Sequence, residues 1–476
     1  MALPVLLEDA LTTDGSGFLL RVSLPWIRSM PLAGVTDLAV TVDGDPVTVS
    51  AIIDGRLVPP AALVEEGAWW FVQDRLTLRG ELSLEDGPHD IRVSFVLLVP
   101  YLQAGPDGPL ALPFDTARTV AVGDGRRSPA LLAQTSPRPA SPPNHGARGA
   151  WILSASAFNW TPEVIRAERT AMDIAVGIVE DAVAETIEIE AGQLWRSFPA
   201  PSEIDVDAFR ERLAAAGGAV TIVGASLDDW ALPPRRRTVE ERLAFLAPQL
   251  RAAARLGARG VRVPFGQAGP ALLALVQPVL DELDIVLFEE IQGQQTLDSP
   301  AVAENLELLQ ALEDPRIRVL VDISMLMPAL PPSYLDELRR GGVDEGLVAR
   351  LEQEWRAPAT HQAVVATLRA GAIPPPLHTL FMNMLVRFGR STVADIAPLL
   401  PLTSGVHLKF WDLDDTAGRV SRPIADIGEA LRRAGFTGTF TSEWGGHEWL
   451  AEDATDMTRR HLELARRALS PAGALD

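Results

Sequence analysis

Eight short apolar runs alternate with helix-like segments over the last two thirds of the chain, and this alternation constrains the fold more than any other feature. The runs are Trp151–Ala155, Thr186–Glu190, Val220–Gly224, Gly260–Pro264, Ile285–Glu290, Arg318–Ile323, Gly405–Lys409 and Gly438–Glu443. The segments with helical periodicity are Pro162–Glu180, Asp205–Ala216, Val239–Leu256, Pro270–Leu283, Ala301–Leu312, Ile424–Ala434 and Ala454–Leu469. Eight βα repeats in about 320 residues predict a (β/α)8 TIM barrel over residues 150–476. The alternative, a doubly wound open sheet, usually has fewer strands.

One connection between the predicted strands is far longer than the others. Asp322 and His407 are 85 positions apart, and the stretch between them contains two proline-rich pieces, Pro328–Pro332 and Pro374–Pro376. Helical patterns occur at Ser333–Arg340 and Glu345–Trp355. Long insertions after a barrel strand usually form lids or partner contacts. We therefore expect an insertion at about 328–400, lying over the face of the barrel that carries the active site.

The first 115 residues have a different pattern and predict a small all-β, sandwich-like domain. Short β-rich runs occur at Gly17–Leu24, Leu38–Val42, Trp69–Gln73, Arg75–Arg79 and Asp90–Val99. Asp43-Gly44 between two of these runs fits a two-residue hairpin turn. Residues 116–149 are rich in proline and predict an extended linker. His145 falls in this linker, where we expect a solvated side chain.

Composition excludes several classes of function. The net charge of −21 argues against nucleic acid and anionic membrane surfaces as partners. There is no cysteine, hence no disulfide, thiolate metal site or cysteine nucleophile. Neither a phosphate-binding glycine loop nor an apolar run long enough to span a membrane occurs. The N-terminus lacks the marks of a signal peptide, and we expect a cytoplasmic protein.

Four predicted strands place a metal-ligand residue near their C-terminal ends, where active sites of such barrels lie. These residues are Glu290, Asp322, His407 and Glu443. Strands five to eight of a barrel are neighbours, so the four side chains can converge. Three carboxylates and one imidazole suit a hard divalent cation, with Mn²⁺ expected first and Mg²⁺ or Co²⁺ as alternatives. The competing interpretation is a set of rim charges satisfied by salt bridges.

Adjacent residues on a strand face opposite ways, so only one of Glu289 and Glu290 can point into the barrel. We expect Glu290 to point inward, because Gln292 then lies on the same face. Gln292 is a candidate substrate-binding residue for that reason.

The motifs also resemble two known families. Residues 151–470 resemble the xylose isomerase-like barrels of sugar isomerases and epimerases, whose strands five to eight carry Glu, Asp, His and Glu around a divalent ion; the His-Leu-Lys at 407–409 is similar to their His-x-Lys. Residues 1–115 resemble the small β subunit of bacterial C-glycoside deglycosidases, through GFLLRVSLPWIRSMPLAGVTDLAVTVDG, WWFV and GPHDIRVSFVLLVPYL. In that family a barrel of this metal-dependent kind forms the α subunit. The chain looks like the two subunits fused, β part first.

The resemblance implies a lyase-type deglycosidase that acts on sugars already oxidised at C3, and hence an upstream sugar 3-oxidase. The 3-oxo group acidifies the C2 proton, the ion binds the 3-oxo oxygen and the 2-hydroxyl, and the C1 substituent leaves as the aglycone. Glu290 and Glu443 are then ligands that can also exchange protons. Lys409 and His447 are candidates for acid–base or oxyanion roles.

Several further residues have two possible roles. Arg262 either binds sugar hydroxyls or forms a salt bridge, and Trp444 and Trp411 either stack on the substrate or pack. Related barrels often have a histidine where this chain has Gln292 or Met325, so their proton-transfer residue is not carried over. His447 is the first substitute, and His361 and His378 of the insertion are others.

Three classes of function are compatible with the sequence. The first is the metal-dependent deglycosidase of 3-oxo-glycosides, with C-glycosides as the first substrate class and O-glycosides as the second. The second is a divalent-metal sugar isomerase or epimerase with a β appendage of unrelated role, because both reactions begin with a proton beside a carbonyl. The third is a metal-free carbohydrate-binding or scaffold protein, against which the full ligand set speaks. We expect a homo-oligomer in each enzymatic case.

Overall fold

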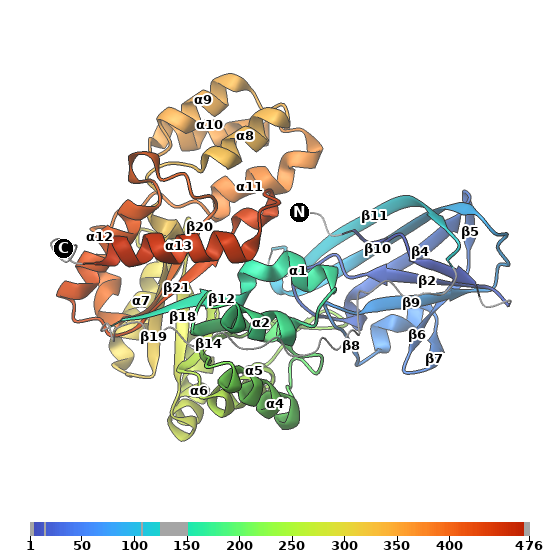
Figure 1. Cartoon of the computed structure of the whole chain (residues 1–476), viewed down its shortest axis with the longest axis horizontal. Helices are drawn as coiled ribbons and strands as arrows, with labels where there is room; N and C mark the ends of the chain where they lie inside the picture. The colour runs from blue at the N-terminus through green and yellow to red at the C-terminus, as the bar shows by residue number, and fades with distance from the viewer. Residues whose placement is uncertain (1–3, 14–15, 106–107, 124–150, 471–476) are drawn as a thin grey trace.

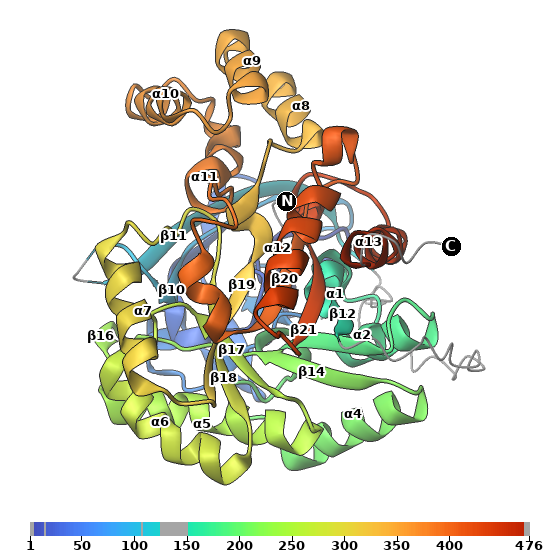
Figure 2. The same cartoon turned by 90° about the vertical axis from the view of Figure 1, so that its left-hand side faces the viewer.

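A closed barrel of eight parallel strands forms the centre of the molecule, which we describe from a computed structural model covering residues 4–13, 16–105, 108–123 and 151–470 (Figures 1 and 2). Around the barrel the strands follow chain order: β12 (Ile152–Ser156), β13 (Thr186–Glu190), β14 (Ala219–Gly224), β17 (Gly260–Pro264), β18 (Val286–Ile291), β19 (Ile317–Asp322), β20 (Thr403–Phe410) and β21 (Thr439–Trp444). The predicted TIM barrel and its eight strands are confirmed.

Helices surround the barrel on its outer side, as the end-on view in Figure 2 shows. They are α1 (Thr161–Arg166), α2 (Ala171–Glu180), α3 (Ala191–Leu194), α4 (Glu203–Ala215), α5 (Val239–Leu256), α6 (Gly269–Leu283), α7 (Pro300–Leu312), α12 (Ser421–Arg433) and α13 (Ala454–Leu469).

The segment predicted as one helix over Pro162–Glu180 forms two. Ala167 adopts a left-handed conformation that ends α1, and the Thr170 side chain accepts the backbone N–H of Asp173 to begin α2.

Two antiparallel sheets enclose a separate apolar core in the N-terminal part of the chain, at the right of Figure 1. One sheet has the order β1 (Leu11–Thr13), β2 (Phe18–Ser23), β9 (Arg75–Gly80), β6 (Val49–Ile53) and β7 (Arg56–Val58). The other has the order β11 (Pro109–Ala121), β10 (Pro88–Gln103), β4 (Val35–Val42) and β5 (Asp45–Val47). Asp43 and Gly44 both have positive φ and join β4 to β5 in the expected hairpin turn.

Two boundaries of this β domain differ from expectation. Strand β11 pairs with β10 as far as Ala121, so the domain extends past residue 115 into the segment expected as linker. His145 lies outside the described residues. The run expected as a strand over Trp69–Gln73 forms only β8 (Trp69–Trp70), which pairs with β3 (Met30–Pro31). The chain leaves the sheet after Trp70 because the next residues pack against the barrel.

Apolar and polar side chains join the β domain to the barrel. Phe71 and Val72 belong to the barrel's apolar core, and Trp69 lies edge-on to Phe198 at 4.9 Å between ring centroids. Gln73 is buried, and its side chain donates to the carbonyls of Val164 and Arg169 while accepting the N–H of Ala171. The contacted segments follow β12 and β13, so the domain docks on the C-terminal side of the barrel strands.

A buried ion pair also crosses this interface. Arg28 of the β domain contacts Asp228 at 2.7 Å, and their side chains are 9% and 1% exposed. Asp228 follows β14, in the same segment as the small hairpin of β15 (Trp230–Ala231) and β16 (Arg235–Arg236). Next to Arg28, both the N–H and the hydroxyl of Ser29 donate to the carbonyl of Gly192. The loops after three successive barrel strands are therefore held by the β domain.

The connection between β19 and β20 forms a helical insertion above the barrel in Figure 1. It contains α8 (Pro332–Arg340), α9 (Glu345–Gln353), α10 (Pro358–Arg369) and α11 (His378–Val386), packed around their own apolar core. Arg387, directly after α11, pairs with Glu448 beyond β21, and the side chain of Gln294 beyond β18 donates to the carbonyls of Met384 and Phe388. The insertion thus also lies against the C-terminal side of the barrel strands.

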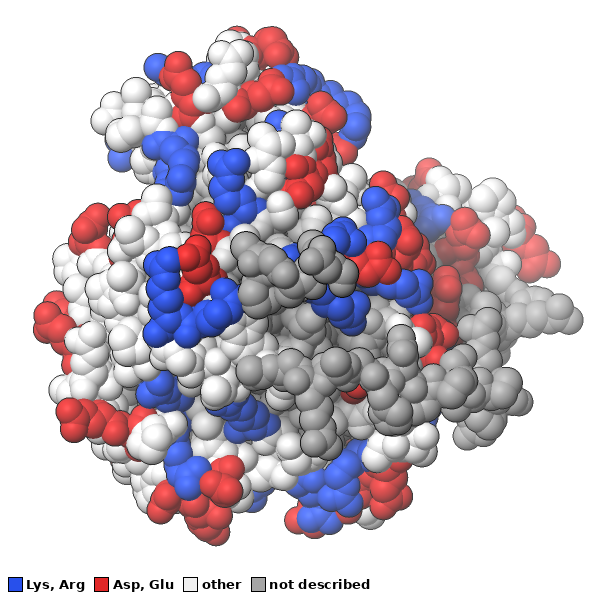
Figure 3. All heavy atoms as spheres, turned by 60° about the vertical axis from the view of Figure 1, so that its left-hand side comes forward, with Lys and Arg blue, Asp and Glu red and all other residues white. Residues whose placement is uncertain are grey.

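The surface carries charges of both signs. On the face in Figure 3, basic and acidic side chains are interspersed over the barrel helices and the insertion rather than gathered in one patch. Among the described residues, no helix has the length and apolar character needed to cross a membrane.

The Arg28–Asp228 pair predicts a large loss of stability when only one partner is removed. Arg28→Ala leaves a buried carboxylate without its cation and should lower the free energy of unfolding by about 3–5 kcal/mol. Denaturant unfolding followed by tryptophan fluorescence measures this loss. The control is Arg56→Ala, which breaks an exposed pair with Glu66 and should leave the midpoint almost unchanged. Equal midpoints for the two variants would contradict a stabilising role of the buried pair.

Candidate metal-binding site

The inside of the barrel is filled in layers, and the layer nearest the C-terminal ends of the strands is polar. Ile222, Phe288 and Leu320 form a small apolar cluster inside the barrel. Two residues further along their strands are Glu290 and Asp322, which face the same way because side chains alternate along a strand. The apolar layer thus closes the barrel beneath a group of carboxylates.

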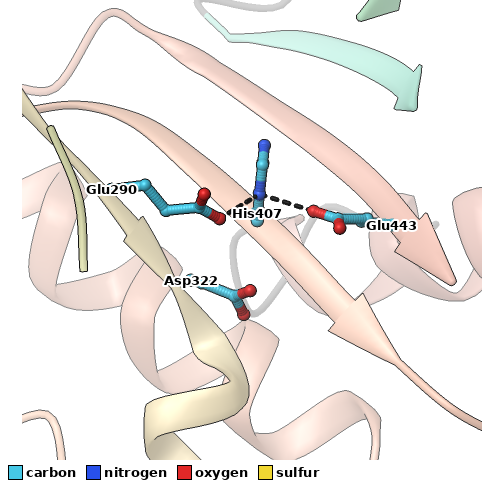
Figure 4. Close-up of side chains that lie close together, drawn as sticks. All are labelled: Glu290, Asp322, His407 and Glu443. Atoms are coloured by element: carbon cyan, nitrogen blue, oxygen red, sulfur yellow. Dashed lines mark hydrogen bonds and ion pairs between the residues drawn. The ribbon is translucent and has the colours of Figure 1, made fainter. Parts of the chain in front are cut away.

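Four ligand-type side chains converge in this polar layer: Glu290, Asp322, His407 and Glu443, here called the four-residue cluster (Figure 4). One potential ligand atom from each lies within 4.8 Å of the others, and all four residues are buried. Asp322 and His407 are direct partners in the register of β19 and β20. The cluster arises from neighbouring parallel strands that place their inward-facing ends side by side.

Glu289 points away from this cluster, as expected from alternation. Its carboxylate accepts hydrogen bonds from the Asn305 side chain at 2.5 Å and from the N–H of Gly266 at 3.1 Å. Glu290 is the member of the pair that faces into the barrel.

His407 lies between carboxylates on both sides of its ring. Nδ1 is 2.8 Å from Glu290 Oε1 and 2.5 Å from Glu443 Oε2, while Nε2 is 3.0 Å from Glu188 Oε2. Burial lowers the pKa of His407, but the negative charges of Glu188, Glu443 and Glu290 raise it well above its ordinary value. A single N–H at Nδ1 would have to be divided between two carboxylates, whereas a cation bound there could be a ligand partner of both.

Asp322, like His407, lies where a bound cation would stabilise the surrounding carboxylates. Its Oδ2 is buried and makes no hydrogen bond within the described part of the chain. Burial raises the pKa of Asp322 to about 7, against the lowering effect of Lys409. Lys409 Nζ contacts Glu443 Oε1 at 2.6 Å and helps hold the pKa of Glu443 well below its usual range despite burial. An orphaned carboxylate oxygen beside three further hard ligands fits a divalent cation.

Two glutamates that the sequence interpretation missed, Glu188 and Glu190, lie beside the cluster and pair with Arg262. Arg262 contacts Glu188 and Glu290 at 2.8 Å each and also pairs with Glu190. Arg262 thus forms the salt bridges of one predicted alternative, and its sugar-binding role stays a prediction. The signal for the missed residues was the run TIEIE at 186–190, in which two glutamates two residues apart share one face of a barrel strand.

The two predicted stacking tryptophans pack instead. Trp444 is 1% exposed, its indole N–H donates to the carbonyl of Trp411, and its ring stacks near Phe410 on the outer side of β20 and β21. Trp444 follows the inward-facing Glu443, so alternation directs it to the helix layer. Trp411 is buried in the core of the insertion against Phe388. The substrate-binding assignment of Trp444 is corrected on this ground.

Gln292 is exposed just beyond the end of β18, and its substrate-binding role stays a prediction.

The candidate histidines lie at different places. His447 is buried against Phe158 and Trp444, with Nε2 unpartnered among the described residues. Burial, with Lys409 and Arg387, lowers the pKa of His447 to about 3, so the ring is neutral at pH 7 and a weak base. In the insertion, His361 contacts Arg390, and His378 contacts the carbonyl of Ile373.

Comparisons with known proteins agree with this two-part organisation. No model of a known protein family matches the chain. A C-glycoside deglycosidase alpha subunit of Arthrobacter globiformis is 27% identical over 341 residues, covering 69% of this chain and 96% of that protein. A 3'-dehydrocarminate deglycosidase beta subunit of a Microbacterium species is 36% identical over 103 residues, covering 21% of this chain and 78% of that protein. Among solved structures, a xylose isomerase domain protein of Alicyclobacillus acidocaldarius is 16% identical, with a TM-score of 0.40, covering 67% of this chain and 98% of that one.

The fold is a TIM barrel preceded by a small all-β domain. The relatives of the chain include both alpha and beta subunits of one kind of enzyme, the beta subunits matching its N-terminal region. The chain belongs to the C-glycoside deglycosidase family and combines the two subunit types in one polypeptide.

The opposite orientations of two adjacent glutamates give a matched test of the metal site. Glu290→Gln removes a charged ligand and should lower the affinity for Mn²⁺ at least tenfold, whereas Glu289→Gln keeps an acceptor for Asn305 and Gly266 and should bind Mn²⁺ as the wild type does. Equilibrium dialysis after chelation measures both. Asp322→Ala and His407→Ala should lose the bound ion as well. Unchanged Mn²⁺ binding by Glu290→Gln would remove Glu290 from the site.

Proposed function

We propose that the protein is a metal-dependent deglycosidase of 3-oxo-glycosides. C-glycosides are the first substrate class and O-glycosides the second, and the reaction is deprotonation at C2 followed by elimination of the aglycone from C1. The observation that carries the proposal is the four-residue cluster at the C-terminal end of the barrel in a chain of this family. The names of the relatives indicate the class of reaction, and the cluster provides the ligands for the divalent cation that this reaction would use.

The four-residue cluster would hold a divalent cation, Mn²⁺ first, which would supply Lewis-acid stabilisation of the negative charge developing on the 3-oxo oxygen. The chain's own residues perform the remaining tasks. Glu290 and Glu443 are the candidates that take the C2 proton. Lys409, already 2.6 Å from Glu443, adds a fixed positive charge beside the forming oxyanion.

An unoxidised glucoside has no carbonyl, and its C2 proton is far too weak an acid for a carboxylate to remove. The 3-oxo substrate must therefore come from a separate enzyme that oxidises C3. No nicotinamide is consumed in the elimination itself.

The same cluster would also serve a sugar isomerase or epimerase, because those reactions begin with the same proton transfer. The docked β domain favours deglycosidation, since the matching relatives are deglycosidase beta subunits. Loss of the aglycone separates the two reactions.

The protein loaded with Mn²⁺ should release the aglycone from a 3-oxo-glucoside and not from the parent glucoside, without added nicotinamide. The reason is the acidity of the C2 proton, which only the ketone provides. Chromatography of the free aglycone and mass spectrometry of a C2-deuterated substrate measure the two outcomes, and the deuterium should pass to solvent. Glu443→Gln and Glu290→Gln should each lose activity. Cleavage of the unoxidised glucoside, or a sugar product that keeps its C2 deuterium, would overturn the elimination mechanism.

A further inference from the structure

We propose, on the basis of the proposed function, that Glu190 is the general acid that protonates the departing aglycone. Glu190 is the last residue of β13 and is not part of the four-residue cluster. Gln292 and Met325 have no side chain that can act as an acid, and Glu190 would supply the proton from another strand.

Glu190 and the cluster come from different strands of the barrel. In the closed barrel β13 is four strands away from β19 in either direction, so Glu190 and Asp322 belong to opposite strands. Arg262 links Glu190 to the cluster, contacting Glu190 with one nitrogen and Glu290 with another. Glu190 therefore lies next to the cluster, on a strand that contributes no ligand to it.

The carboxyl of Glu190 occupies a space kept open for it. A Cβ added to Gly224, the last residue of β14, would lie 2.3 Å from a Glu190 carboxylate oxygen. The Glu190 side chain remains 22% exposed, whereas Glu188 on the same face is 0% exposed. Glu188 is fully buried against His407, whereas Glu190 is the member of the pair that a substrate can reach.

Burial favours the protonated form of Glu190. Burial raises its pKa to about 7, against Arg262 of β17, and the carboxylates of Glu188, Glu443 and Glu290 raise it further. These groups come from β13, β17, β18 and β21, so the effect does not depend on a single neighbour. An acid with a pKa near the working pH can both give up a proton and regain one.

The alternative donors are less suited. Lys409 Nζ is held by Glu443 at 2.6 Å. His447, with a pKa of about 3, carries no proton to give as an imidazolium at pH 7.

The β domain fixes the turn that carries Glu190. Helix α3 begins directly after it, and the carbonyl of Gly192 accepts two hydrogen bonds from Ser29, each 2.8 Å long. The side chain of Gln193 donates to the carbonyl of Ile27 at 2.8 Å. The β domain therefore holds Glu190 in place without contributing a reacting group.

The proton balance of the step is complete without a further reactant. The base takes the C2 proton, and the C2 electron pair forms the C1–C2 double bond. The bond from C1 to the aglycone breaks, and its electron pair goes to the aglycone atom, which takes the proton of Glu190. The products are the unsaturated 3-oxo sugar and the protonated aglycone.

A leaving-group series tests this assignment in the full chain loaded with Mn²⁺. Glu190→Gln should lower aglycone release from phenyl 3-oxo-glucoside by about 10²–10⁴-fold, the usual contribution of a general acid. Release from the 4-nitrophenyl analogue should fall much less, because nitrophenolate leaves without a proton. Exchange of the C2 proton with solvent deuterium should persist in the variant. Glu185→Gln, an exposed glutamate just before the same strand, is the matched control and should behave as wild type.

The pH profile gives a second readout. Because the acid must hold its proton, wild-type release from the phenyl substrate should fall as the pH rises through about 7, and Glu190→Gln should lack this decline. If Glu190→Gln does not fold, Gly224→Ala displaces the same carboxyl and should show the same dependence on the leaving group.

The outcomes separate this inference from the proposed function. Failure of the wild type to release any aglycone or exchange its C2 proton would overturn the function itself. Equal losses for both leaving groups, an unchanged pH profile, or loss of Mn²⁺ binding in Glu190→Gln would leave the function standing and overturn the role of Glu190.

Discussion

Buried negative charge in one layer of the barrel is the constraint on which the site depends. Five carboxyl groups meet there: Glu188, Glu190, Glu290, Asp322 and Glu443. Arg262 and Lys409 bring two positive charges, which is fewer than the five carboxyl groups, of which all but the partly exposed Glu190 are buried. A divalent cation would balance two more, and a proton on the fifth carboxyl would complete the neutralisation. With a cation at the four-residue cluster, Glu190, which is not one of its members, is the carboxyl for which we propose the proton.

The scaffold explains why these charges can be assembled at all. Parallel strands all end at one face, and an apolar layer beneath them keeps the barrel closed. The β domain holds the loops after β12, β13 and β14, while the insertion contacts the loops after β18 and β21. Two bodies distant in sequence thus border the same face from different sides. Each leaves the inward-facing ends of the strands available for the metal ion and the substrate.

The sequence predicted the barrel and the four-residue cluster because both follow from local patterns. Each of the eight strands is a short apolar run, and each ligand falls at its end. Glu188 and Glu190 lie in the same kind of run, but nothing in the sequence TIEIE indicates whether its two glutamates face into the barrel or away from it. The outward direction of Trp444 and the docking roles of Arg28 and Gln73 depend on partners far away in sequence. No local pattern contains those contacts.

The interface also explains why fusing the two parts is useful. If the β domain separated, Phe71 and Val72 would lose the barrel core, and Arg28 and Asp228 would lose each other. Within one chain the two parts meet at a high effective concentration, so the interface persists at dilutions that would separate free subunits. The turn at Gly192 and Gln193 gains most from this arrangement, because its hydrogen bonds to Ser29 and Ile27 exist only in the docked state. A fused chain can therefore keep Glu190 positioned at protein concentrations where an enzyme of separate subunits would lose it.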